Sequence, residues 1–214
     1  MKRRDMILVV SLKLFNEEGE ANLTAVDIAN ELDISPGNLY YHFKGKEELV
    51  AELYKQFETG IVALLQGAND AGDTLEEQWL HLYVVLEYIY LYRFFFRNTT
   101  DLLQKYPAID GHFRRLLEQQ YQSIRAMLHN LLEEGVLASN CSEEIRIDEL
   151  ADNMMLIYTY WFEFQNLRKR QLNQHKFVQG AILQIMTLLA PYMGDMQRQF
   201  TEECNALYQR DKQD

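Results

Sequence analysis

The chain has 214 residues, of which 48% are hydrophobic and 25% charged, with only 10 Gly and 3 Pro. These fractions are typical of a globular protein and exclude a disordered, collagen-like or low-complexity chain. The two cysteines, Cys141 and Cys204, form no CxxC pattern, so the sequence supports neither a disulfide scaffold nor a zinc site. We expect reduced thiols and a cytoplasmic location.

The net charge of −11 argues by itself against a nucleic-acid partner, but its distribution does not. Residues 1–46 carry six basic side chains against seven acidic ones, so nearly all of the excess acid lies later in the chain. The basic residues gather at the two ends of this segment. Folding that brings the two ends together would form one basic surface.

Helical periodicity dominates the whole chain, and no stretch alternates as a strand does, so we predict an all-α fold. The first helix is expected over residues 4–18. A second begins after Thr24, whose side chain and that of Asp27 form a capping box. Ser35 is an N-cap and Pro36 suits the first helical position, which predicts a short helix over 36–43. Two helices joined by a short turn are typical of a helix-turn-helix.

The rest of the chain reads as a larger helical bundle behind a linking helix at 47–66. Further helices are expected at 74–97, 100–105, 109–134, 142–170, 174–190 and 195–210. The apolar run from Trp79 to Phe96 contains His81, Glu87 and Arg93, which favours a buried helix over a membrane span. We therefore predict two domains, a helix-turn-helix domain at 1–50 and a larger helical domain at 51–214, for which the residues discussed below suggest DNA binding in the first and ligand binding and dimerisation in the second.

The first 50 residues resemble the DNA-binding domain of the tetracycline-repressor (TetR/AcrR) family of transcriptional regulators. The resemblance rests on Ile7, Leu14, Phe15, Gly19, Thr24, Ile28, Ala29, Ser35, Gly37, Leu39, Tyr40, His42, Phe43, Lys46 and Leu49. One departure is Asp33, where the family usually has Gly in the turn; Asp tolerates a left-handed backbone better than most residues. The resemblance implies a three-helix DNA-binding domain, a helical regulatory domain and, most often, a repressor that responds to a small molecule.

The residues expected to contact DNA lie on and around the short helix 36–43. Exposed Asn38 and Tyr41 are our candidates for base edges, with Gly37 permitting close approach. Tyr40, His42, Lys44 and Lys46 suit phosphates, Lys46 especially because it begins the next helix. The full predicted set is Thr24, Ser35, Pro36, Gly37, Asn38, Tyr40, Tyr41, His42, Lys44 and Lys46. Lys2, Arg3 and Arg4 form a short basic arm that could reach a minor groove.

Aromatic residues dominate the second part and predict a pocket for an apolar or aromatic small molecule. The candidate lining is Trp79, Tyr83, Leu86, Tyr90, Phe94, Phe113, Tyr121, Tyr158, Trp161 and Phe162. The alternative is a solid core, because aromatic stripes at helical spacing are usually packing.

Two apolar stripes predict a homodimer interface. A dimer would also place two copies of the DNA-contacting helix 36–43 about 34–36 Å apart on a pseudo-palindromic operator. Its candidates are Met154, Ile157, Trp161, Phe164, Val178, Ile182, Ile185 and Leu189. The alternative is that these stripes face the protomer's own core.

Catalytic signals are weak. Asp148, Glu149 and Asp152 lie on one helix and could bind Mg²⁺, but a solvated acidic face is the simpler interpretation. The histidines lack metal-binding spacing, and no nucleotide-binding or nucleophile motif occurs. We expect no enzyme, no cofactor and no metal. A helical enzyme or carrier without DNA binding, and a constitutive DNA-binding dimer with a filled core, are the alternatives.

Overall fold

A computed structural model describes residues 2–67, 75–138, 144–170 and 173–193, and every regular element in these ranges is a helix. The all-α prediction is confirmed. The described chain forms two compact units. The first comprises the residues up to Gly60 together with Tyr92–Arg114, and the second comprises Ile61–Leu91 with the described residues after Arg114.

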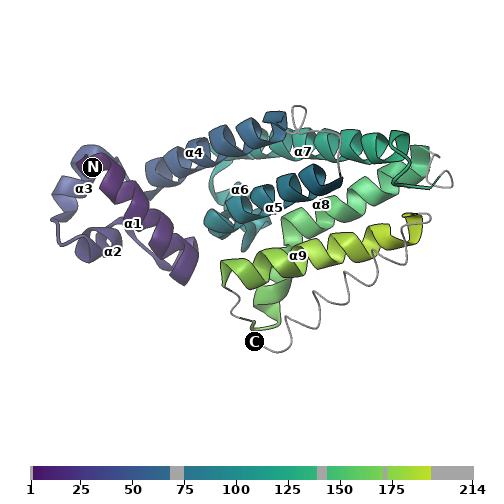
Figure 1. Cartoon of the computed structure of the whole chain (residues 1–214). Helices are drawn as coiled ribbons and strands as arrows, with labels where there is room; N and C mark the ends of the chain where they lie inside the picture. Colours follow the sequence, from purple (N-terminus) through teal and green to yellow (C-terminus); the bar gives the residue numbers. More distant parts are fainter. Residues whose placement is uncertain (1, 68–74, 139–143, 171–172, 194–214) are drawn as a thin grey trace. The chain divides into compact units, whose positions relative to one another are not determined.

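The first unit begins with a cluster of short helices: α1 (Arg3–Glu18), η1 (Glu20–Asn22), α2 (Ala25–Glu31) and α3 (Pro36–His42) (Figure 1). Helix α1 ends at Gly19, whose φ of 89° suits glycine and whose N–H donates to the carbonyl of Phe15 at 3.1 Å. The apolar face of α1 buries Ile7, Leu14 and Phe15. These bounds agree with the sequence periodicity to within one residue, apart from η1, which it did not reveal.

The remainder of the first unit is an aromatic core between longer helices. It contains most of α4 (Lys46–Gly67), η2 (Arg93–Phe96), α6 (Thr99–Lys105) and the start of α7 (Pro107–Glu133). Phe57 is fully buried, and its ring centroid lies 5.7 Å from that of Phe95 and 5.8 Å from that of Phe96. Tyr54 packs edge-on against Phe95 at 5.5 Å. The predicted boundary at residue 50 lies inside this unit, within α4.

The helix predicted over 74–97 is shorter in the structure, where α5 spans Leu75–Leu91. Tyr92 leaves helical geometry with φ −111° and ψ 32°, and η2 follows. Phe94 and the next two phenylalanines are all buried, which a single face of an α-helix cannot achieve for three consecutive residues. The side-chain oxygen of Asn16 accepts a hydrogen bond from the Phe94 N–H at 3.0 Å and fixes the break.

The second unit packs α9 (Gln174–Leu189) against both α5 and α8 (Glu144–Leu167), followed by η4 (Ala190–Tyr192). The indole N–H of Trp161 donates to the carbonyl of Phe177 at 3.1 Å. A Cβ placed on Gly180 would lie 3.0 Å from the Trp161 ring, so glycine permits the close approach of α8 and α9. The predicted helix 195–210 lies outside the described residues. Among the described helices, none is long and apolar enough to cross a membrane.

Candidate DNA-binding and effector sites

The turn between α2 and α3 closes the helix-turn-helix. The Ile34 N–H donates to the carbonyl of Ala29 at 3.0 Å, and the Asp33 N–H donates to that of Asn30 at 3.0 Å. This pairing is the Schellman motif, which needs one left-handed residue. Asp33 supplies it with a φ of 51°. Aspartate therefore adopts the conformation for which glycine is usual, as its tolerance of the left-handed region predicts.

Helix α3 presents one face to the outside. The Ser35 hydroxyl accepts the N–H of Asn38 at 3.2 Å, which caps the helix as predicted. Leu39 is fully buried, whereas Tyr40 is 48% exposed and Tyr41 is 86% exposed. Since a tyrosine ring that buries so little of its surface contributes little to folding, the outward face is available to a partner.

Gly37 lies on this face between Pro36 and Asn38, and both it and Asn38 are exposed. A Cβ added to Gly37 would meet only the Ser35 hydroxyl oxygen, at 3.9 Å. Its backbone φ lies outside the left-handed region. Neither packing nor backbone geometry in the described chain therefore requires glycine here, and the missing side chain leaves room for a partner to approach the helix.

Thr24 is the N-cap of α2. Its hydroxyl donates to the Asp27 carboxylate at 2.6 Å and accepts the Asp27 N–H at 3.2 Å, while the Thr24 N–H donates to the same carboxylate at 2.8 Å. The capping box is confirmed, and the bonds from Thr24 lower the pKa of Asp27. A hydrogen bond from Thr24 to a phosphate would have to replace the one to Asp27.

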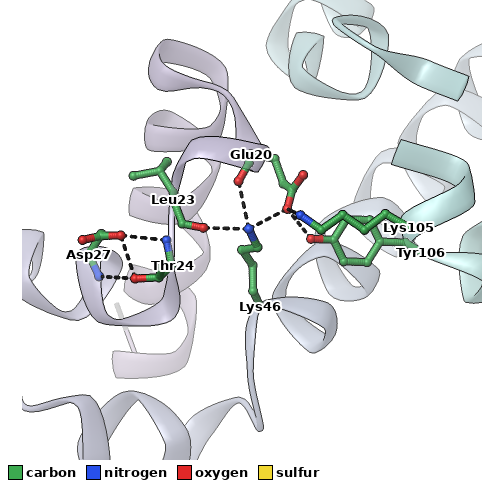
Figure 2. A network of polar contacts seen from close by, with 7 residues as sticks. All are labelled: Glu20, Leu23, Thr24, Asp27, Lys46, Lys105 and Tyr106. Atoms are coloured by element: carbon green, nitrogen blue, oxygen red, sulfur yellow. Dashed lines mark hydrogen bonds and ion pairs between the residues drawn. The ribbon is translucent and has the colours of Figure 1, made fainter. Parts of the chain in front are cut away.

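Lys46 lies in a polar network inside the first unit (Figure 2). Its ammonium group donates to the carbonyls of Leu23 at 2.6 Å and Glu20 at 3.0 Å, and pairs with the Glu20 carboxylate at 2.7 Å. Only 14% of the side chain is exposed. The structure therefore places this ammonium group on the connection between α1 and α2, which the predicted phosphate contact did not anticipate.

Glu20 is the centre of this network and is itself buried. Besides Lys46, its carboxylate binds the ammonium group of Lys105 at 2.8 Å and the hydroxyl of Tyr106. Burial alone would raise the pKa of Glu20, but the hydrogen bonds from Lys105, Lys46 and Tyr106 outweigh it and lower the pKa. One carboxylate thus ties the helix-turn-helix to α4 and to the junction of α6 and α7.

The other predicted phosphate contacts lie near the end of α3. Lys44 is exposed, and its N–H donates to Glu48 at 2.7 Å. His42 is half-buried and meets the ring of Tyr41 edge-on, with 5.1 Å between centroids. The predicted arm is shorter than expected, because Arg3 begins α1 and Arg4 pairs with Glu52 at 3.2 Å.

The predicted effector residues do not share one pocket. Phe94 and Phe113 belong to the core of the first unit, where both are buried. In the second unit, Tyr90 and Phe162 pack against Phe177, at 5.1 and 6.0 Å, and Trp161 bonds to its carbonyl. Tyr121 donates to Asp148, Leu86 is fully buried, and Trp79 and Tyr83 are half-buried on α5. Of the ten candidates, Tyr158 alone lines a cavity between the helices of the second unit.

Counted together with the open solvent at its mouth, this cavity has an empty volume of about 480 Å³. Helices α4, α5, α7 and α8 enclose it. Its apolar walls come from Leu65, Leu82, Val85, Ile124, Ala126 and Met127. Its polar groups are Gln78, His81, Gln120, Ser123, Asn130 and Tyr158. The cavity could not be predicted from the sequence, because most of its lining residues are polar or small. The aromatic pattern indicated the packed core instead.

The predicted dimer residues divide between core and surface. Met154, Val178, Ile185 and Leu189 are fully buried within the protomer, as the alternative interpretation held. Ile157, Trp161 and Ile182 are half-buried, and Phe164 is 48% exposed. The exposed apolar stripe of α8 consists of Leu156, Tyr160, Phe164 and Leu167, so it shares Phe164 with the predicted set and faces away from the buried Met154.

Two of the three candidate carboxylates of α8 pair with arginines. Asp148 pairs with Arg125 at 2.6 Å, and Glu149 pairs with Arg146 at 2.6 Å. Within the described residues, no group of three His, Cys, Asp or Glu side chains could hold a metal ion.

Comparison with known proteins agrees with this architecture. Residues 7–53 match the family described as "Bacterial regulatory proteins, tetR family", and residues 56–200 match the family described as "Bacterial transcriptional repressor". The transcriptional repressor KstR2 of Mycolicibacterium smegmatis is 25% identical over 150 residues, which are 68% of this chain and 71% of KstR2. The probable transcriptional regulator YttP of Bacillus subtilis is 31% identical over 62% of this chain and 64% of YttP.

Solved structures agree as well. A TetR-family regulator from Marinobacter aquaeolei VT8 has a TM-score of 0.85 and 30% identity, covering 97% of this chain and 99% of that one. The ketosteroid regulator KstR2 of Mycobacterium tuberculosis, at 20% identity, has a TM-score of 0.69 over 91% of this chain and 96% of its own. The matched families and relatives are DNA-binding regulators and not enzymes. With both of its parts matched in order, the chain belongs to the TetR family of bacterial transcriptional regulators.

Proposed function

We propose that this TetR-family regulator is a homodimeric repressor that binds a pseudo-palindromic operator through α3 and releases it when a small ligand fills the cavity of the second unit. The observation that carries the DNA-binding part is the outward face of α3. Gly37, Asn38 and Tyr41 are exposed there on a helix whose start is capped by Ser35. An α-helix of this kind enters the major groove with its N-terminal residues against base edges.

Each side chain of this face has a chemical role in the proposal. Asn38 can bond adenine through both side-chain atoms, and the Tyr41 ring can contact a thymine methyl group. Tyr40 and Lys44, both exposed, suit phosphates. Because the Lys46 ammonium group is engaged with Glu20 and Leu23, we assign Lys46 a structural role. The N–H groups in the first turn of α4 provide the phosphate contact there.

DNA binding is tested by selecting bound duplexes from random DNA and measuring affinity for the selected operator by fluorescence anisotropy. Asn38→Ala should change the base preference at one position of each half-site, by about 5- to 150-fold in affinity ratio. Tyr40→Ala should weaken binding to all duplexes alike. Gln104→Ala, an exposed change on α6, is the control. A wild-type protein that selects no sequence, or an Asn38→Ala variant with unchanged preference, would contradict the site.

The second copy is assigned to the exposed stripe of α8, formed by Leu156, Tyr160, Phe164 and Leu167. These residues repeat every three or four positions, so they lie along one side of the helix. A monomer that contacts one half-site reads few base pairs, whereas a two-fold dimer reads two half-sites one helical turn apart. Symmetric pairing of this stripe would bury apolar surface that the protomer leaves in water.

Ligand release is supported by the cavity. A filled second unit would favour a constitutive DNA-binding protein, but here polar and apolar groups converge on an internal space. A ligand that fits the cavity in one arrangement of the surrounding helices shifts the protein towards that arrangement. A coupling of about 1–3 kcal/mol would change operator affinity 5- to 150-fold. The anisotropy assay with added ligand measures this change directly.

A further inference from the structure

The described residues that line the cavity carry no formal charge. Among the described residues that line it, none is Asp, Glu, Lys or Arg. Its polar groups are amides, hydroxyls and one imidazole, all of which bind neutral partners through hydrogen bonds. The described lining therefore offers no counter-charge to a carboxylate, phosphate or ammonium group, and such an ion would lose its hydration on entering.

Gln120 marks the position within the cavity where a ligand should bond. The residue is 3% exposed, and its Nε2 atom has no hydrogen-bond partner among the described residues. A buried amide N–H that lacks a partner is destabilising, because the bonds it made to water in the unfolded chain are not replaced. Gln120 lines the cavity, so an acceptor inside the cavity would satisfy it.

The two titratable groups of the lining favour their neutral forms. Burial lowers the pKa of His81, so the imidazole is uncharged near pH 7. Burial also raises the pKa of Tyr158, whose hydroxyl therefore stays protonated. Tyr158 is 4% exposed and lines the same cavity as Gln120.

We infer that the effector is an uncharged, mainly apolar molecule with an oxygen acceptor, such as a ketone, ester, lactone or amide carbonyl, that bonds to Gln120. The inference deepens the proposed function, since it assumes that the cavity is the effector site. The hydrocarbon part of the ligand would contact Leu82, Val85 and Met127 on the apolar walls. A charged acid or amine of the same skeleton should be rejected.

The test uses two matched sets of compounds and DNA-free protein, with affinity measured by calorimetry and by thermal shift. The first set is 4-phenyl-2-butanone, butylbenzene, 3-phenylpropanoate and 4-phenylbutan-2-amine. The second is 2-decanone, decane, nonanoate and 2-aminodecane. Within a set the skeleton is nearly constant while the carbonyl is removed or replaced by a charge. At least one ketone should bind, about 3- to 10-fold more tightly than its hydrocarbon and more than tenfold more tightly than its acid and amine.

Gln120→Met removes the orphaned donor while keeping the side-chain length. It should weaken ketone binding about 3- to 10-fold and leave hydrocarbon binding unchanged, so that the preference for the ketone disappears. Retained hydrocarbon binding shows that the cavity is intact. Gln104→Met, an exposed change on α6 away from the cavity, is the control and should behave as the wild type.

The inference is overturned if neither ketone binds, if an acid or amine binds as tightly as its ketone, or if Gln120→Met keeps the ketone preference. These measurements need no DNA, so they are separate from the proposed function. If a ketone binds through Gln120 and leaves operator affinity unchanged, the ligand class stands and the proposed release mechanism fails.

Discussion

Substituting Lys46 by methionine separates a structural role from a DNA-contacting one. Lys46→Met keeps the apolar stem and removes an ammonium group that makes three contacts of 2.6, 2.7 and 3.0 Å (Figure 2). The lost partners are the carbonyls of Glu20 and Leu23 and the Glu20 carboxylate. Lys105 and Tyr106 still bind that carboxylate, so it keeps one ion pair and one hydrogen bond.

The magnitude follows from these contacts. Hydrogen bonds from a charged donor contribute about 1.5–3 kcal/mol each, and removing one partner of a buried ion pair costs about 3–5 kcal/mol. Because Glu20 keeps two partners, we expect the lower part of that range, about 3–4 kcal/mol. For a chain of this size, 1 kcal/mol shifts Tm by about 2–4 °C, which predicts a fall of roughly 6–16 °C.

The assay is thermal unfolding followed by circular dichroism, paired with the salt dependence of operator affinity. Lys44→Met is the control, since Lys44 is exposed and suits a phosphate. It should leave Tm nearly unchanged and reduce the slope of log affinity against log salt by about one. The reasoning is refuted if Lys46→Met unfolds within 2 °C of the wild type (about the shift from 1 kcal/mol) while its salt slope falls by about one.

Three further predictions follow from the two units. The folded-state pKa of Glu20 lies below its unfolded value, so the stability that its ionised carboxylate contributes is complete above about pH 4.5 and is lost as the pH falls through the folded pKa. The Tm of Glu20→Gln should therefore fall less on acidification than the Tm of the wild type, and an equal fall would argue against the network. Asp33→Ala should lower the free energy of unfolding by about 1 kcal/mol in urea titrations while Asp33→Gly should not, because only glycine takes a positive φ freely; equal effects would count against the left-handed turn. Tyr160→Glu should sediment as a monomer and bind the operator weakly, with Leu80→Glu, another exposed apolar position, as the control; a dimeric Tyr160→Glu would move the interface elsewhere.

Much of the first unit is determined locally and was predictable from the sequence. The start of α2 follows from the Thr24–Asp27 capping box, and the start of α3 from Ser35 and Pro36, because these contacts join residues three positions apart. The left-handed turn at Asp33 is also local. The exposed face of α3, which carries the DNA-binding proposal, therefore depends on a few neighbouring residues.

Tertiary structure alone decided the features that depend on distant residues. Lys46 meets Glu20, 26 positions earlier, and the side chain of Asn16 accepts a hydrogen bond from the N–H of Phe94 in η2, 78 positions later. The cavity depends in the same way on Gln120, a polar residue that no apolar pattern marks. Helical periodicity shows that a stripe is apolar, but it does not show which neighbour covers that stripe. The sequence therefore could not distinguish the buried face of α8 from the exposed stripe around Tyr160. Burial is settled by what packs against a side chain, and those partners are set by the whole chain.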